Sequence, residues 1–265
     1  MSDGLHPAAA EGFAAAATRY ESGRPGYPPE ALSWLVDELS LGTGRRVLDL
    51  AAGTGKLTGA LVATGSDVVA VEPVSPMRAV LAGHVPAAEA IDGTAEAIPL
   101  PDAAVDAVTV AQAFHWFDAE RAVAEIHRVL RPGGRLAVVF NVRDETVPWQ
   151  AQLTQMLHPL EGDAPRHRHG TWRAALDAAE GFARARERSF VYRPDTSPEL
   201  VLDRVASMSF VAAAEPAERA RVLDEVRRLL ATDPETAGRA RFPFPYRTDC
   251  LVLDRVAARS SPDPD

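Results

Sequence analysis

The stretch VLDLAAGTGKLT, residues 47–58, decides the fold of this chain. Apolar residues that flank one acid, Asp49, lead into a run of small residues containing Gly53 and Gly55, and apolar residues then recur at helical spacing. The pattern predicts a strand, a tight turn and a helix. Glycine has no Cβ and lets the backbone approach a ligand closely, and the first turn of the helix offers N–H groups to that ligand. The stretch therefore predicts a cradle of the kind that binds nucleotides.

Two neighbouring features indicate which ligand the cradle holds. Asp49 lies where a dinucleotide enzyme places a diphosphate, which a carboxylate would repel, and Thr58 occupies the third small-residue position of the dinucleotide fingerprint. A second apolar run, VVAVEP, ends in Glu72, nineteen residues after Gly53. The two oxygens of that carboxylate are able to accept hydrogen bonds from both hydroxyls of a ribose. We expect a ribose ligand without phosphates and with a positive charge.

Strand and helix patterns alternate along the first half of the chain. Apolar runs predict strands at 46–50, 67–71, 88–91, 105–110 and 135–140, joined by helices, so the sheet is expected to be parallel there. Residues 140–182 show no strand pattern and predict a helix over 148–160 and another from Thr171. Two later stretches, 183–192 and 246–255, read as strands again, and helices follow Ser197 and open at Pro216.

Composition excludes several classes of protein. With 265 residues, 46% of them hydrophobic, the chain suits one α/β domain with an elaborated region. A net charge of −9, relieved only by the RHRH run at 166–169, disfavours nucleic acid as a partner. The spacing His167-x-His169 lacks a carboxylate or cysteine partner nearby, so no metal site is predicted. A lone Cys250 and the lack of a long apolar run predict a cytoplasmic protein with no membrane partner.

Four stretches together resemble a known family. VLDLAAGTGKLT, VVAVEP, DGTAEAIPLPDAAVDAVTVAQAFHWFD and EIHRVLRPGGRLAVVF are similar, in order and spacing, to the motifs of class I S-adenosylmethionine-dependent methyltransferases, nearest to the small-molecule (type 11-like) group with an HWFD signature. The resemblance implies an α/β, doubly wound, mostly parallel seven-stranded sheet with an antiparallel edge strand. It places 183–192 and 246–255 at that edge. It also implies methyl transfer from S-adenosyl-L-methionine to a small organic acceptor.

The resemblance also implies a set of cofactor-binding residues. They lie in the N-terminal cover, the glycine turn, the ends of the next strands and the loop that holds the adenine: Tyr20, Arg24, Asp49, Ala51, Gly53, Thr54, Gly55, Glu72, Pro73, Met77, Thr94, Ala95, Glu96, Ala111 and Gln112. Two positions depart from the family pattern. Ala51 replaces the usual first glycine of the turn, which suggests a less open turn, and Thr94 replaces an Asp that touches the adenine amino group.

Residues near the end of the strand at 105–110 are candidates for the acceptor side. Ligands of open α/β sheets bind beyond the carboxyl ends of the strands, which places His115 near the glycine turn. Its imidazole would accept a proton from a substrate or position it, and the alternative is a half-buried histidine bonded to backbone beside Trp116. Trp116 is the second candidate for substrate contact, and packing is its alternative. A dedicated base is optional because alignment supplies much of the acceleration in a methyl transfer.

The connection after residue 146 is predicted to be a helical lid. It begins at the carboxyl edge of the sheet, so Met156 and Trp172 are expected to line the acceptor pocket, and a peripheral helix pair is the alternative. The expected divisions are a disordered N-terminus over 1–12, a cofactor-binding core over 13–146, the lid over 147–181, edge strands in 182–258 and a tail over 259–265.

Two other classes of function stay open at the level of sequence. A non-catalytic or regulatory protein would keep the same cofactor pocket, since Glu72 and the glycine turn are compatible with binding alone. An NAD-dependent oxidoreductase is the less favoured reading because of Asp49 and Thr58. The sequence assigns neither the acceptor atom nor the oligomeric state.

Overall fold

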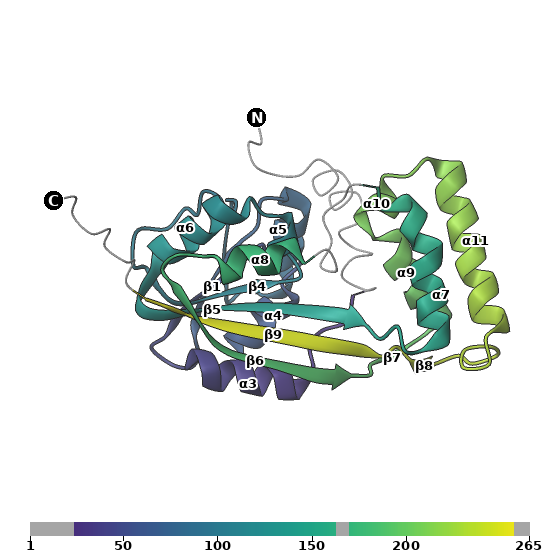
Figure 1. Ribbon diagram of the computed structural model, residues 1–265, viewed down its shortest axis with the longest axis horizontal. Coiled ribbons are helices and arrows are strands. Elements are labelled where there is room, and N and C mark those ends of the chain that lie inside the picture. The colour runs from purple at the N-terminus through teal and green to yellow at the C-terminus, as the bar shows by residue number, and fades with distance from the viewer. Residues whose placement is uncertain (1–23, 163–169, 257–265) are drawn as a thin grey trace.

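The computed structural model describes residues 24–162 and 170–256, and its centre is one seven-stranded sheet (Figure 1). The strand order is β3-β2-β1-β4-β5-β9-β6. The bounds are β1 Arg46–Leu50, β2 Asp67–Val71, β3 Glu89–Ile91, β4 Val105–Ala111, β5 Leu130–Arg143, β6 Phe182–Tyr192 and β9 Tyr246–Arg255, and β7 Asp195–Thr196 pairs with β8 Phe242–Pro243 in a separate ribbon. The seven-stranded sheet expected from the family resemblance is confirmed.

Strand directions follow the predicted pattern. The strands β1 to β5 run parallel to one another, with Leu48 opposite Val69 of β2 and Val108 of β4. β9 runs antiparallel to both β5 and β6, so the late strands form the antiparallel pair at one edge, with β6 outermost. β5 begins at Leu130, earlier than the predicted 135, because it pairs with β4 on both sides of a register shift around the Pro132-Gly133-Gly134 turn.

Helices cover both faces of the sheet (Figure 1). The bounds are α3 Pro29–Leu39, α4 Lys56–Val62, α5 Ser75–His84, η1 Phe114–Trp116, α6 Ala119–Val129, α7 Pro148–Leu157, η2 His158–Leu160, α8 Thr171–Asp177, α9 Pro198–Ala206, α10 Ser209–Ala212 and α11 Pro216–Thr232. The apolar residues of α3 and α4 pack on one face, through Val47, Val68 and Cys250. Those of α6 and α8 pack on the other face, through Leu48, Val69 and Leu251. Alternation along each strand thus fills both cores.

A separate apolar core lies among helices at the end of the sheet toward which β5 points (Figure 1). It joins Trp149 and Leu153 of α7 to Val201 of α9, Val226 of α11 and Phe244. Trp149 packs edge-on against Phe242 and Phe244, with ring centroids 5.8 and 5.0 Å apart. We call the helices α7, α9, α10 and α11 together the helical cap.

The predicted lid over 147–181 is therefore divided in the structure. Its first helix, α7, joins the helical cap, whereas α8 packs beside α6 on the main sheet, with Trp172 and Leu176 in the core there. The two helices separate because their apolar faces match different partners, and those partners lie far apart in the sequence. The single lid with those bounds needs correction, and residues 163–169 between its halves lie outside the described part of the chain, as do 1–23 and 257–265.

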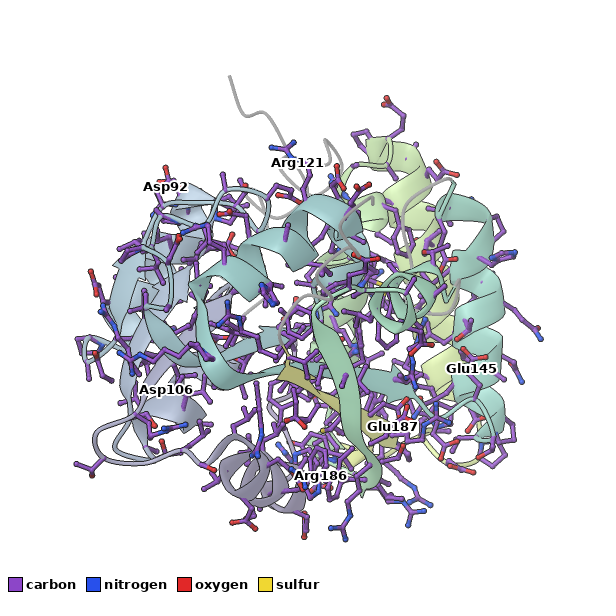
Figure 2. All side chains as sticks on the ribbon, turned by 60° about the vertical axis from the view of Figure 1, so that its left-hand side comes forward. Asp92, Asp106, Arg121, Glu145, Arg186 and Glu187 are labelled. Carbon is purple, nitrogen blue, oxygen red and sulfur yellow. The ribbon has the colours of Figure 1, made fainter. Side chains whose placement is uncertain are left out.

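The outer strand β6 carries charged side chains on both of its faces (Figure 2). Adjacent residues of a strand point to opposite faces, so Arg186 pairs with Glu38 of α3 while Glu187 pairs with Arg173 of α8 at 2.6 Å. Such charges protect an edge strand from pairing with another chain. None of the helices in residues 24–162 and 170–256 is long and apolar enough to cross a membrane.

Candidate functional site

A crevice lies at the carboxyl ends of β1 and β4, where the sequence predicts the ligand. It encloses about 540 Å³ of space not filled by atoms, its open mouth included. Its walls come from the glycine turn, from the ends of β4 and β5, from the segment before α3 and from α9: Asp49, Ala51, Ala52, Gly53, Thr54, Lys56, Leu57, Ala111, Gln112, Asn141, Arg24, Pro25, Tyr27 and Arg204. Seven of the predicted cofactor residues are in this set: Arg24, Asp49, Ala51, Gly53, Thr54, Ala111 and Gln112.

Asp49 forms the buried acidic floor of the crevice. Its side chain is 1% exposed, and its two oxygens accept hydrogen bonds from the hydroxyls of Thr58 (2.6 Å) and Thr109 (2.9 Å). Burial raises the pKa of the carboxyl to about 6, and the two hydroxyls oppose that rise. Near neutral pH the floor is a carboxylate that favours a cation in the crevice.

Thr58 and Thr109 hold the carboxylate of Asp49, and the sequence did not predict this contact for either residue. In the sequence, Thr58 is notable only as a departure from the dinucleotide fingerprint. In the structure this residue lies on the first turns of α4, where its hydroxyl reaches back to the strand before it. The sequence does contain a signal for this contact, since Thr58 follows Asp49 by nine residues. At that spacing the first turn of the helix can lie beside the end of the preceding strand.

Two non-glycine residues of the crevice have left-handed backbone. Ala51 follows β1 with φ of 56°, and Gln112 follows β4 with φ of 60°. Both come directly after the last residue of a strand, and both line the crevice. A Cβ in this conformation costs about 1–2 kcal/mol of steric strain. The turn thus keeps the glycine-like path although the family's first glycine is Ala51 here.

Gly53 and Gly55 serve the turn differently. Gly53 has φ of 60°, and a Cβ added there would meet no atom within 4 Å, so it borders open space on the crevice side. Gly55 has φ of 91°, and a Cβ there would approach Leu81 and Val85 to 3.1 and 3.2 Å. Gly55 is therefore a packing glycine behind the turn, whereas Gly53 leaves room for a ligand.

Glu72 links the turn after β1 to the turn after β2. Its Oε2 accepts a hydrogen bond from the Gly53 N–H (2.8 Å) and its Oε1 accepts one from the Val74 N–H (2.9 Å). The residue is 4% exposed, and burial raises the pKa of its carboxyl. Each carboxylate oxygen has two lone pairs, so each oxygen keeps capacity for one more donor.

The residues predicted to hold an adenine lie beyond Glu72 and outside the walls of the crevice. Met77 and Ala95 are buried, while Pro73 and Thr94 are half-buried. Thr94 bridges Ala97 across a tight turn, and the carboxylate of Glu96 accepts a hydrogen bond from the Asp118 N–H at 3.0 Å. This side offers apolar surface and backbone groups, and the Glu96 carboxylate already supports the loop before α6. Tyr20 lies outside the described residues.

The predicted acceptor residues fall into two places. His115, Trp116 and Trp172 belong to one aromatic group around Phe140, with ring centroids of His115 and Trp172 at 5.6 and 4.8 Å from that of Phe140. Met156 instead packs on the helical cap. None of these four residues is a wall of the crevice. In the described residues no cluster of three or more His, Cys, Asp or Glu side chains is arranged to hold a metal ion.

Comparison with known proteins gives consistent matches. A family profile described as "Methyltransferase domain" matches residues 48–138. An uncharacterized methyltransferase of Mycobacterium tuberculosis is 44% identical over 239 residues, which cover 90% of this chain and 93% of that protein. A demethylmenaquinone methyltransferase of Thermus thermophilus is 43% identical over 102 residues, 36% of this chain and 46% of that protein. A solved structure from Anaeromyxobacter dehalogenans, described as a candidate type II methyltransferase, superposes with a TM-score of 0.64 at 25% identity, covering 88% and 97% of the two chains.

The left-handed backbone of Ala51 leads to a stability prediction. Replacing Ala51 with Gly removes the Cβ strain but adds flexibility to the unfolded chain, so Ala51→Gly should raise the free energy of unfolding by about 0.5–1 kcal/mol. Chemical denaturation without ligand measures this. Ala52→Gly is the matched control because the φ of Ala52 is not left-handed, and this variant should lose stability. Equal losses in both variants would show that the Ala51 backbone is not strained.

Proposed function

Because the chain belongs to the class I S-adenosylmethionine-dependent methyltransferase family, we propose that it transfers the methyl group by in-line displacement to a small organic acceptor. The observation that carries this proposal is the crevice itself, with its carboxylate floor and glycine turn, and a second cavity beside it. S-adenosylmethionine, when bound, supplies a methyl group on a positively charged sulfur. The residues of the chain fit a cation with a ribose, because Asp49 favours positive charge and Glu72 has acceptor capacity to spare.

We assign the cofactor residues by region. Asp49, Ala51, Gly53, Thr54, Ala111 and Gln112 surround the amino-acid part, and Arg24 covers it from the segment before α3. Glu72 takes the ribose hydroxyls. Pro73, Met77, Thr94, Ala95 and Glu96 border the adenine, where Met77 and Ala95 supply apolar surface. Gly55 acts through packing, since its backbone rests on Leu81 and Val85.

A second cavity beside the crevice is suited to the acceptor. It encloses about 370 Å³, within the range of small-molecule pockets, and shares Arg24, Pro25 and Arg204 with the crevice. Leu200, Phe244 and Tyr246 supply apolar walls from the helical cap and from the start of β9. The helix of the cap that lines this cavity is α9, whereas the sequence-based expectation was an acceptor pocket formed by residues 147–181. The name of the Thermus thermophilus relative, a demethylmenaquinone methyltransferase, supports a small organic acceptor.

His115, the sequence-based candidate for proton removal, lines neither cavity, so we propose that the chain uses no dedicated base. His115 follows Gln112 by three residues, near the carboxyl end of β4. The His115 ring packs against the rings of Trp116 and Phe140. The main contribution of the chain is alignment, because two neighbouring cavities hold the two reactants in fixed places.

Methyl transfer can be tested with labelled cofactor and a panel of small metabolites. We expect labelled product and S-adenosylhomocysteine from at least one acceptor. Gly53→Ala should lose most of this turnover because its Cβ enters the space of the cofactor. Gly238→Ala is the matched control, since Gly238 also has a left-handed φ, of 70°, and open space around it, but lies away from the crevice. Tight binding without turnover of any acceptor would favour the non-catalytic alternative.

The role of Glu72 can be separated from its support of the turn. Glu72→Ala should weaken binding of S-adenosylhomocysteine by about 1–3 kcal/mol, the scale for hydrogen bonds to a charged acceptor. Calorimetry with the 2′,3′-dideoxy analogue isolates the ribose contribution. Removing the hydroxyls should cost affinity in the wild type and cost nothing in Glu72→Ala. An equal cost in both proteins would show that Glu72 only holds the turn.

A further inference from the structure

Three arginines from distant parts of the chain meet around Tyr246. Arg24 precedes α3, Arg143 is the last residue of β5 and Arg204 belongs to α9. Arg143 lies directly opposite Tyr246 in the β5–β9 register, and the guanidinium carbon of Arg204 is 4.6 Å from the centroid of the Tyr246 ring. All three guanidinium groups favour the charged form of the Tyr246 phenol, although burial raises its pKa to about 12.

Two of these arginines stand at the junction of the two cavities. Arg24 and Arg204 are walls of both the cofactor crevice and the cavity assigned to the acceptor. Among the described residues that line the acceptor cavity, the one acid is Asp195, whose side chain is 67% exposed and lies 4.0 Å from Arg241. The inner part of this cavity thus has positive charge from Arg204 and Arg24 against apolar walls.

The energetics of these side chains point to a ligand. Arg204 is only 6% exposed, and its guanidinium stacks over both Phe244 (5.1 Å) and Tyr246, which fixes its plane. Among the residues that the structure describes, Nη1 of Arg143 is buried without a hydrogen-bond partner. Burial lowers the pKa of Arg143, and the charges of Tyr246, Glu145 and Glu161 oppose this through space. Keeping a guanidinium donor buried and unmatched is costly, and a bound oxyanion would relieve that cost.

We infer that the methyl acceptor carries an anionic oxyacid group, a carboxylate or a phosphate, which Arg204 anchors from the wall of the cavity beside the crevice. Arg143, which lies outside that wall and opposite Tyr246 in the sheet, adds a second donor to this group. The inference rests on the proposed function, since it names the class of acceptor. A guanidinium presents parallel N–H donors that match the two oxygens of such a group. Anchoring at Tyr246 would leave the remainder of the acceptor directed through the shared opening toward the glycine turn. Arg24, at that opening, stays with the cofactor.

The test measures anion binding by calorimetry to the full chain saturated with S-adenosylhomocysteine. The probes are glutarate, citrate and inorganic phosphate, with neutral glutaramide as the comparison. We expect at least one anion to bind and glutaramide not to bind. Arg204→Gln and Arg143→Gln should each weaken the anion about 10- to 100-fold, the loss of a hydrogen bond between charged groups. Arg227→Gln, on the exposed side of α11, is the matched control and should change nothing.

Several outcomes would overturn the inference. The inference fails if no anion binds, or if the anion binds equally well to Arg204→Gln and to the wild type. It also fails if the substitutions weaken binding of S-adenosylhomocysteine and not of the anion, because the arginines would then hold the carboxylate of the cofactor. Turnover of neutral acceptors alone would also overturn it while leaving the proposed function intact. If the anion bound through the arginines but no acceptor were methylated, the anion site would be supported and the proposed function would be contradicted.

A stability measurement guards against a purely structural role. Arg143→Gln removes an unmatched buried charge, so without ligand it should unfold at a temperature no lower than the wild type. A marked loss of thermal stability in Arg143→Gln would mean that this arginine serves the fold and would contradict its part in the site. Arg143→Lys keeps the positive charge but loses the parallel N–H donors of the guanidinium, so this variant should bind the anion with intermediate affinity.

Discussion

The two hydrogen bonds that hold the carboxylate of Asp49 are the interaction on which the rest of this site depends. A carboxylate on a buried strand is costly, because desolvation disfavours the charged form. The hydroxyls of Thr58 and Thr109 supply two donors in compensation, and they come from the helix after β1 and from the neighbouring strand β4. The same contacts therefore join β1, α4 and β4 at the edge where the crevice opens. With that floor in place, the turn from Ala51 to Gly55 passes around it and Glu72 closes the turn from the side of β2.

Two separate apolar cores support the two cavities, one for each reactant. The main sheet, covered by α3 and α4 on one face and α6 and α8 on the other, positions the cofactor crevice. The helical cap has its own core and contributes Arg204 and the Phe244 region to the second cavity. Such an arrangement allows the walls around an acceptor to change without disturbing the floor at Asp49. The aromatic group of His115, Phe140 and Trp172 stabilises the side of the sheet below α8 and stands apart from both cavities.

Local patterns were sufficient to predict the elements and the place of the crevice. The strand over 46–50, the turn with its two glycines and the strand over 246–255 each have a short-range signature, and all three agree with the structure. What the sequence did not reveal depends on contacts between distant residues. The sequence around Arg204 does not indicate that this residue lines a crevice formed mainly by the first half of the chain. Likewise, the apolar face of α7 does not predict whether that helix packs against α8 or against α11. Trp172 looked like a pocket residue for the same reason, since an aromatic side chain in a core has the same local sequence pattern.

The pH dependence of cofactor affinity tests the central role of Asp49 most directly. The cation in the crevice prefers the ionised carboxylate, and the ionised fraction falls as pH decreases through the pKa of about 6. Calorimetric titration of S-adenosylmethionine between neutral pH and pH about 5 should show affinity that is constant at the upper end and falls below the pKa, approaching tenfold per pH unit. Asp49→Asn, whose amide keeps two hydroxyl partners but cannot ionise, should bind more weakly and lack this step. Affinity that falls identically in the wild type and in Asp49→Asn, or that does not change with pH in the wild type, would contradict the account.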